Sequence, residues 1–377
     1  MAKYLWACWD GGGNLTPSLG VAGALADRGH DVEFFGRPQM VPRVTAAGLA
    51  AAELADSFRL IDQFSSHPLA TVFGYTCSPA VGEELVGVVA ERQPDVVVID
   101  AMFTAALAVA PRYDRPTAVM VHTLFDRLYD GWQGLTTMQS ELRQQAGHDG
   151  LPGLDVLWGQ RDLIQVNTLA AFDVPRATDW TNVRHGAPVL AMESRALPFD
   201  LPWSVDDPTP IVLVSFSTVA EQKSVDKLQR ALDALAPLPV HVVATTGGIV
   251  DPADLRAPDD AFVVEFADHD ALLSRAALLV GHGGHGTTMR SLSTGVPMVI
   301  IPAVALDQGP NGTMVGEWGA GIALLDDPGV EEIRAAAQKV LADASFTDAA
   351  ARAGAQLAGL DGSLLAADSL EELLGIG

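Results

Sequence analysis

Short runs of apolar residues, bounded by glycine, proline or polar residues, recur along the whole chain and alternate with segments of helical period. In the first half these runs predict strands at residues 4–9, 32–35, 96–99, 117–121 and 163–166. In the second half they predict strands at residues 211–215, 240–244, 262–265, 278–280 and 298–301. Uninterrupted apolar runs of this length are typical of parallel strands that are covered on both faces. The pattern therefore predicts an α/β protein.

The segment after the first strand predicts a helix. An apolar stripe runs from Leu15 to Ala26, and Thr16 is the expected N-cap, with Pro17 as the first helical residue. Together with the flanking strands this segment forms a β–α–β opening, which is typical of a Rossmann-like domain.

Two stretches of the first half, residues 37–82 and 122–160, show no clear period and carry scattered aromatic residues. We expect irregular insertions there that form the wall of an apolar pocket, although such aromatic residues also occur in ordinary cores. The candidate pocket residues are Phe73, His122, Phe125 and Trp132. His122 follows a predicted strand, where a lone histidine is more often structural than catalytic.

A proline-rich segment divides the chain. Residues 198–210 contain four prolines, which break both helices and strands. We expect an N-terminal domain at residues 1–197, a linker at 198–210 and a C-terminal domain at 211–377, whose final helix is free to pack back on the N-terminal domain. Two similar alternating halves predict two facing Rossmann-like domains with parallel sheets and a ligand site in the cleft between them.

Composition narrows the possible partners. Of the 377 residues 49% are hydrophobic, and the formal charge is 23 − 47 = −24, which argues against nucleic acid and anionic membranes as partners. Two cysteines are too few for a disulfide framework, the N-terminus does not read as a signal peptide, and no apolar run reaches the length of a membrane span. We expect a cytoplasmic protein that is a monomer or a homodimer.

The most informative stretch is the glycine-rich turn that follows the strand at 278–280. Gly281, Gly283, Gly284 and Gly286 let the backbone turn sharply just before a predicted helix, and His282 lies within the turn. Free N–H groups at a helix N-terminus, with hydroxyls beside them, form an anion site that suits phosphate. A purely structural turn is the alternative interpretation of these residues.

The flanks of this turn resemble a known family. The pattern His-Gly-Gly-x-Gly-Thr-Thr-Met, then Gly-Val-Pro-Met, then Pro…Asp-Gln-x-x-Asn is similar to the donor-binding signature of family 1 glycosyltransferases, which have the two-domain GT-B fold. The signature covers about 45 residues, and weaker likeness extends over the chain. Within the family, the likeness is greatest to bacterial glycosyltransferases that decorate antibiotics, including macrolides, and other natural products.

The resemblance implies a role for each matching residue. It assigns the diphosphate to His282 and the backbone from Gly284 through Gly286 to Thr287, with Ser217 and Thr218 as a second phosphate loop. It assigns the sugar hydroxyls to Asp307 and Gln308, and the nucleobase to Phe266 and Ala267. Without the resemblance, Ser217 and Thr218 would be read as helix-capping residues, and Asp307 and Gln308 as loop residues. Asp268 and Asp270 form an Asp-x-Asp that we interpret as helix capping, not as a metal site.

The implied activity is an inverting, metal-independent transfer of a sugar from a dTDP- or UDP-sugar to a hydroxyl of an apolar small molecule. The nucleotide sugar is then a co-substrate, and no cofactor or metal is expected. One alternative is a sugar-nucleotide-binding helper protein without catalysis, and another is a nucleotide-sugar 2-epimerase on the same fold. The sequence does not identify the acceptor.

The catalytic base is where this sequence departs from the family. The family places histidine three residues before the proline that opens the first helix, whereas this chain has Asn14 there. An amide cannot act as a base near neutral pH. Asp100 matches the acid that partners the missing histidine, and Asp10 lies four residues before Asn14. Our first candidate for the base is Asp10 and our second is Asp100, with another group as a third possibility.

Arg290 is a second departure. The family often has glutamate at this position to bind ribose hydroxyls in enzymes that use UDP-sugars. Arginine cannot accept those hydrogen bonds. Because dTDP lacks the 2′-hydroxyl, residue 290 by itself favours a dTDP-deoxysugar as the donor.

Overall fold

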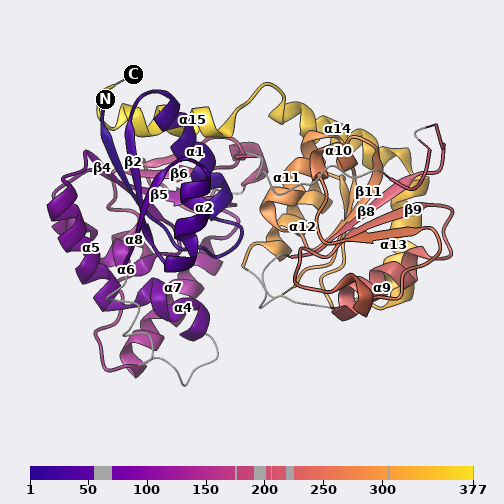
Figure 1. The fold of residues 1–377 in the computed structure, drawn as a ribbon, viewed down its shortest axis with the longest axis horizontal. Helices are drawn as coiled ribbons and strands as arrows, with labels where there is room; N and C mark the ends of the chain where they lie inside the picture. The colour runs from indigo at the N-terminus through magenta and orange to yellow at the C-terminus, as the bar shows by residue number, and fades with distance from the viewer. Residues whose placement is uncertain are drawn as a thin grey trace. The chain divides into compact units, whose positions relative to one another are not determined.

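The computed structural model describes residues 1–54, 70–174, 176–190, 201–204, 206–217, 225–303 and 306–376. The chain divides into two compact units, one formed by residues 1–191 with 360–377 and the other by residues 192–359. Each unit has its own parallel sheet with helices on its faces (Figure 1). The α/β class predicted from the apolar runs is confirmed.

The first unit is built on a seven-stranded parallel sheet with the order β3-β2-β1-β4-β5-β6-β7. Its strands are β1 (Lys3–Ala7), β2 (Asp31–Gly36), β3 (Ala50–Glu53), β4 (Val96–Asp100), β5 (Thr117–Val121), β6 (Leu163–Val166) and β7 (Val183–His185). The strand order reverses its direction of growth between β1 and β4, so the carboxyl ends of these two central strands form the switch point where such sheets bind ligands.

Helices connect these strands. The first unit contains α1 (Leu15–Asp27), α2 (Val41–Ala46), α4 (Ala70–Cys77), α5 (Pro79–Arg92), α6 (Thr104–Val109), α7 (Tyr129–Gln145), α8 (Leu154–Leu157) and α15 (Gly362–Glu372). Single 3-10 turns are η1 (Pro38–Met40), η3 (Ala110–Arg112) and η4 (Ala170–Phe172). The C-terminal helix α15, yellow in Figure 1, packs against α1 of the same unit.

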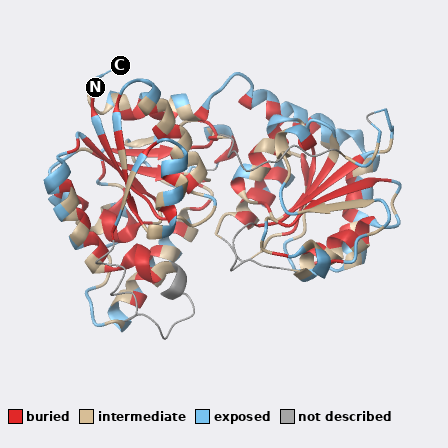
Figure 2. Ribbon diagram, in the orientation of Figure 1, coloured by how far each residue is buried: buried red, intermediate tan, exposed pale blue. Residues whose placement is uncertain are grey.

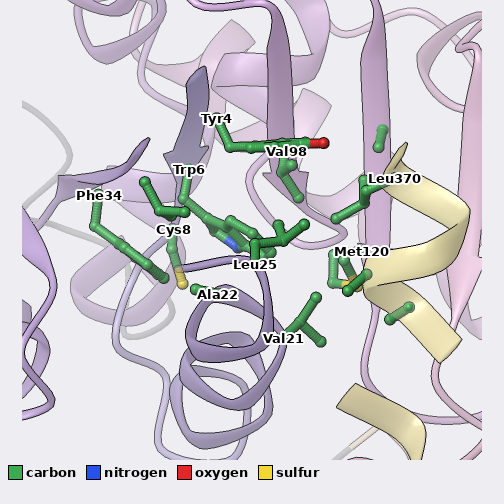
Figure 3. Packing of buried hydrophobic residues seen from close by; sticks show 14 of the residues in the cluster. Tyr4, Trp6, Cys8, Val21, Ala22, Leu25, Phe34, Val98, Met120 and Leu370 are labelled. Atoms are coloured by element: carbon green, nitrogen blue, oxygen red, sulfur yellow. The ribbon is translucent and has the colours of Figure 1, made fainter. Parts of the chain in front are cut away.

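The core of the first unit lies between the sheet and the α1–α15 pair (Figure 3). Trp6 of β1 stacks on Phe34 of β2 with their ring centroids 5.4 Å apart, because the two residues are register partners in the parallel ladder. Leu25 of α1 and Leu370 of α15 complete this layer, and both side chains are fully buried. This packing fixes the sheet edge from which the loop after β1 and the start of α1 emerge.

The second unit has a six-stranded parallel sheet with the order β10-β9-β8-β11-β12-β13. Its strands are β8 (Ile211–Ser215), β9 (His241–Thr245), β10 (Ala261–Val264), β11 (Ala276–Gly281), β12 (Met298–Ile300) and β13 (Gly321–Ala323). Its helices are α9 (Val225–Leu235), α10 (His269–Leu273), α11 (His285–Ser293), α12 (Gln308–Glu317), α13 (Val330–Ala342) and α14 (Ala344–Leu357), and η6 (Pro252–Asp254) is a 3-10 turn. Figure 2 shows the central strands of each unit as the most buried part of its sheet.

Ten predicted strands correspond to β1, β2, β4, β5, β6, β8, β9, β10, β11 and β12, and each end agrees to within two residues. The prediction of irregular structure at 37–82 and 122–160 was wrong where the structure describes those residues, because α2, α4, the start of α5, α7 and α8 lie there. Helix α7 escaped notice because two positions of its buried face are polar: Thr136 donates to Trp132 O, and Gln139 donates to Thr76 Oγ1.

The expected N-cap of the first helix was also wrong. Helix α1 begins at Leu15, which makes Asn14 the N-cap and places Thr16 and Pro17 inside the first turn. The Asn14 side chain does not cap the helix, because its amide is bonded elsewhere, to groups described below.

The tight approach of β2 to β1 gives a stability prediction. A Cβ on Gly36 would lie 1.8 Å from Cys8 O, whereas a Cβ on Gly23, in the middle of α1, would meet no atom within 4 Å. Gly36→Ala should therefore destabilise the protein by about 1–3 kcal/mol through overpacking. Gly23→Ala should stabilise it by about 0.5–1 kcal/mol through helix propensity. Denaturant unfolding of both variants tests this, and equal stabilities would contradict it.

Candidate active site

Polar side chains gather where β1, β4 and β5 of the first unit end. Asp100 is the last residue of β4, His122 follows β5, and Asn14 precedes α1. Because the strands are parallel neighbours, their carboxyl ends meet at one edge of the sheet. The structure therefore brings together three of the residues that the sequence singled out.

Asp100 is the centre of this group, and only 2% of its surface is exposed. Its Oδ1 accepts hydrogen bonds from Trp9 Nε1 at 3.1 Å and from the Met102 amide at 2.9 Å. Its Oδ2 accepts one from Asn14 Nδ2 at 2.9 Å. A buried carboxylate needs such donors, because an unpaired buried charge is very costly.

The orientation of the Asn14 amide follows from its two backbone partners. The Gly11 N–H donates to Asn14 Oδ1 at 2.9 Å, and Asn14 Nδ2 donates to Trp9 O at 2.6 Å. A backbone N–H can only donate and a carbonyl can only accept, so the amide cannot be turned round. The second N–H of Asn14 must therefore point to Asp100 Oδ2 and hold that carboxylate in place.

Burial raises the pKa of Asp100 to about 6, against the opposing effect of the hydrogen bonds from Asn14, Met102 and Trp9. Desolvation disfavours the charged form of a carboxyl group, while donors to the carboxylate favour it. A carboxylate with a pKa near the working pH is ionised at neutrality and is still basic enough to accept a proton. Asp100 is thus a suitable general base.

Asp10, our first candidate, is committed to another interaction. Arg43 of α2 donates from one guanidinium nitrogen to both carboxylate oxygens of Asp10, at 2.7 and 2.8 Å, and from another to Thr16 Oγ1 at 3.3 Å. The Gly12 N–H also donates to Asp10 at 3.2 Å. This ion pair fixes the glycine loop after β1, which indicates a positioning role for Asp10.

His122 lies beside Asp100 in a buried hydrogen-bonded network. Its Nε2 is 4.0 Å from Asp100 Oδ2 and 2.9 Å from Ser18 Oγ, and its Nδ1 is 3.1 Å from Asn167 Nδ2. Ser18 donates its own hydroxyl proton to Asn14 O at 3.0 Å. The network is satisfied when His122 is neutral with its proton on Nε2, so the ring is an ordering element next to the carboxylate.

The other candidate pocket residues differ in their surroundings. Phe125 is fully buried and stacks on Trp158, with ring centroids 5.9 Å apart. The ring centroid of Trp132 lies 5.1 Å from that of Trp158. Phe73, on α4, is half-buried. The loop that carries Phe125 is held by Asp173, whose carboxylate accepts backbone N–H groups from Phe125 and two following residues. Whether these residues line an acceptor site stays a prediction.

In the second unit, the glycine turn between β11 and α11 has the geometry expected of an anion site. Gly283 has φ of 83°, and a Cβ there would lie 2.7 Å from Ile300 and 2.9 Å from Gln308 O, so only glycine fits. Gly284 is the N-cap of α11, Gly286 is exposed and Thr287 is half-buried. The N–H groups of Gly286 and Thr287 lie in the first turn of α11, where backbone N–H groups have no partner within the helix and can bind an anion.

His282 lies in this turn with one ring nitrogen unsatisfied. Its Nδ1 is buried and has no hydrogen-bond partner in the part of the chain that the structure describes. Burial lowers the pKa of His282, against the opposing charge of Asp307 and a contact with the Ser215 backbone. A neutral imidazole carries a single N–H, so Nδ1 can donate to an anionic ligand in the tautomer that has its proton on Nδ1.

The Asp307–Gln308 pair lies at the start of α12. Gln308 is buried, and its Oε1 accepts from the Ala303 N–H at 2.6 Å, so that oxygen shapes the preceding loop. Asp307 is half-buried as the N-cap residue of α12. Asn311 donates to Gly283 O at 2.9 Å and thereby ties α12 to the glycine turn. The structure thus places the predicted sugar-binding pair beside the predicted phosphate site.

Three further predicted positions lie at the same edge of the second sheet. Ser217 follows β8 and is buried, and Phe266 follows β10 with 38% of its surface exposed, next to the half-buried Ala267. Thr218 lies outside the described residues. Asp268 caps α10 by accepting from the N–H groups of Asp270 and Ala271, as the sequence predicted.

The sequence did not single out Trp9, Ser18, Arg43 or Asn167 as site residues. The hydrogen bonds that place these residues in the site join positions 5 to 104 residues apart in the chain. Such contacts can be recognised only when the order of the strands is known. Parallel strand pairing was the one signal in the sequence that could have pointed to these residues, because it brings the residues after each strand to the same edge of the sheet.

The chain is similar to several known proteins. Residues 229–361 match the family described as "Erythromycin biosynthesis protein CIII-like, C-terminal domain". A PGL/p-HBAD biosynthesis glycosyltransferase of Mycobacterium tuberculosis is 34% identical over 140 residues, which are 37% of this chain and 32% of that protein. The chain thus aligns with about a third of the length of these mycobacterial relatives. The 4′-demethylrebeccamycin synthase of Lentzea aerocolonigenes is 27% identical over 432 residues, covering 99% of this chain and 100% of the relative.

Solved structures with the same fold cover the whole chain. The calicheamicin glycosyltransferase CalG4 matches with a TM-score of 0.77 at 24% identity, over 100% of this chain and 98% of that one. The glycosyltransferase VinC in complex with dTDP matches with a TM-score of 0.70 at 21% identity, over 99% of each chain. These structures confirm the predicted GT-B fold, and the family match and the named relatives confirm the predicted resemblance to glycosyltransferases of natural-product biosynthesis. No helix within the described ranges is both long and apolar enough to cross a membrane.

The raised pKa of Asp100 predicts how stability depends on pH. The unfolded chain loses this proton near the ordinary value of 3.8 and the folded protein near 6, so between these values the folded state binds more protons. The free energy of unfolding therefore falls as pH rises through this window, by about 3 kcal/mol for this group. The asparagine in Asp100→Asn does not titrate. The free energy of unfolding of this variant, relative to that of wild type, should therefore rise by about 3 kcal/mol from about pH 4 to about pH 7. If the difference in free energy of unfolding between wild type and Asp100→Asn were the same at every pH in this range, the argument that burial raises the pKa of Asp100 would be contradicted.

Proposed function

We propose that this chain is a glycosyltransferase that moves a sugar from dTDP or UDP to a hydroxyl of an apolar, small-molecule natural product. The observation that carries the proposal is the glycine turn before α11, with its exposed helix N-terminus and the unsatisfied Nδ1 of His282. Diphosphate is the anion that fits these donors in a nucleotide sugar. The names of the relatives support the class of acceptor, and the dTDP bound to VinC supports the class of donor.

The leaving group is stabilised by neutral donors in this account. Backbone N–H groups at Gly286 and Thr287 and the His282 imidazole face the position where negative charge develops as the bond to the diphosphate breaks. Fixed dipoles of this kind replace a divalent cation, and we therefore propose a metal-independent reaction. Direct displacement by the acceptor oxygen, on the face opposite the diphosphate, inverts the anomeric carbon.

Asp100 is the proposed base. As the acceptor oxygen forms its bond to the anomeric carbon, the hydroxyl proton passes to the Asp100 carboxylate, and the electron pair of the breaking bond leaves with the diphosphate. Asn14 takes the place of the family's histidine as a donor to Asp100 Oδ2, not as a base. Asp10, paired with Arg43, holds the glycine loop through which an acceptor approaches. His122 orders the far side of the carboxylate.

Product formation tests the proposal as a whole. Purified protein in EDTA, incubated with dTDP- and UDP-sugars and a panel of apolar acceptors, should give glycosides of inverted configuration, detected by mass spectrometry and proton NMR. Activity that appears only when a divalent cation is added would contradict the metal-free mechanism. Nucleotide binding without any product would favour the non-catalytic helper, and conversion of a UDP-N-acetylhexosamine without an acceptor would favour the epimerase.

His282→Ala tests the diphosphate site. Loss of a hydrogen bond to a charged group should weaken nucleotide binding by about 1.5–3 kcal/mol. Isothermal calorimetry with UDP and dTDP measures this, and His148→Ala is the control, because His148 is an exposed histidine of the first unit. Unchanged affinity in His282→Ala would remove His282 from the site.

Asp100→Asn tests the base. The variant should lose roughly 10²–10⁴-fold in kcat and keep its nucleotide affinity, because a general base acts on the acceptor proton alone. In wild type, kcat/KM should rise with pH through about 6, since Asp100 must lose its proton to act. Asp10→Asn should cost less than Asp100→Asn. A larger loss of kcat in Asp10→Asn than in Asp100→Asn would indicate that Asp10 is the base.

A further inference from the structure

A carboxylate that the sequence did not assign to the donor site is paired with α11, the helix that follows the glycine turn. Arg290 of α11 donates from one guanidinium nitrogen to both oxygens of Asp270 on α10, at 2.7 and 2.8 Å. The Asp270 side chain is 41% exposed and that of Arg290 is 18% exposed. Arg290 thus holds one edge of the carboxylate, while lone pairs on the other edge remain open to a ligand.

The position of this ion pair is fixed from both sides. The Asp270 N–H donates to the capping Asp268 Oδ1 at 3.0 Å. The adjacent His269 contacts Thr245 Oγ1 at 3.3 Å, and Thr245 donates to Ser215 Oγ at 3.0 Å, which ties α10 to the ends of β9 and β8. Burial, followed by the charge of Arg290, lowers the pKa of His269 to about 4, so His269 adds no charge here.

Charge explains why a carboxylate can stand near a diphosphate site. Arg290 lies five residues after the start of α11, roughly 7 Å along the helix axis from the N-terminal N–H groups. An unpaired carboxylate next to Arg290 would repel an anionic ligand at the start of α11, whereas the Asp270–Arg290 pair has no net charge. A ligand that joins a diphosphate to a group rich in hydroxyls would satisfy both features, and hydroxyl protons are what a carboxylate accepts.

We propose that Asp270, held by Arg290, accepts a hydrogen bond from the ribose of the donor nucleotide and makes this site prefer ribonucleoside over 2′-deoxyribonucleoside diphosphates. The inference rests on the proposed function, because it assumes a nucleoside diphosphate at the glycine turn. It also reverses the expectation drawn from residue 290 alone, which favoured dTDP. The arginine removes the acceptor at its own position, but it fixes the carboxylate of another residue beside it.

Calorimetry with UDP, dUDP and dTDP on the full-length protein tests the proposal. UDP and dUDP differ only in the 2′-hydroxyl, and dUDP and dTDP differ only in the 5-methyl group. Wild type should bind UDP roughly ten- to a hundredfold more tightly than dUDP, as expected for a hydrogen bond to a charged group. Asp270→Asn should lower the affinity for UDP to nearly that for dUDP and leave dUDP binding little changed.

Two further variants complete the test. Arg290→Gln should weaken all three nucleotides, because the freed Asp270 carboxylate then repels the diphosphate. Asp226→Asn removes another aspartate paired with an arginine, Arg230 on α9, and should change nothing. Melting temperatures close to that of wild type show that each variant is folded.

The outcomes separate the two proposals. Equal affinity for UDP and dUDP in wild type, or an unchanged preference in Asp270→Asn, overturns the ribose assignment and leaves the donor site intact. Failure of all three nucleotides to bind wild type overturns the donor site and the ribose assignment together.

Discussion

The burial of one carboxylate at the end of β4 is the constraint on which the first unit depends. Asp100 is removed from water, and three N–H donors from the loop after β1, the turn after β4 and the start of α1 keep its anion stable. The same burial raises its pKa to about 6, so the group that costs stability is also the group with useful basicity. Asn14 belongs to this constraint, because its bonds to the Gly11 N–H and to Trp9 O fix the side-chain amide and leave its second N–H to donate to Asp100.

The anion site that we propose in the second unit is built in a different way. The chain carries a net charge of −24, and the glycine turn contains backbone N–H groups and a histidine whose pKa is lowered by burial. The Asp270 carboxylate on the neighbouring helix does not repel an anion at this turn, because Arg290 neutralises its charge. Local dipoles and pairing can therefore favour a diphosphate although the protein as a whole repels it.

Apolar runs predicted ten of the strands, because a parallel strand covered on both faces must be apolar throughout. Helix α7 was not predicted, since Thr136 and Gln139 on its buried face are satisfied by hydrogen bonds that no local pattern encodes. The order of the strands could place Asp100, Asn14 and His122 at one edge. It could not reveal that Arg43 holds Asp10 or that Arg290 holds Asp270, because those contacts join residues 33 and 20 positions apart.

The ionisation of Asp100 measured directly is the sharpest test of this account. Carboxyl carbon NMR on protein labelled with ¹³C at aspartate, with the Asp100 signal identified by its absence from Asp100→Asn, follows the titration of this one group. The account predicts a midpoint near pH 6, about two units above the ordinary value for aspartate. A midpoint at or below the ordinary value of 3.8 would show that the hydrogen bonds outweigh burial, and would contradict Asp100 as the base.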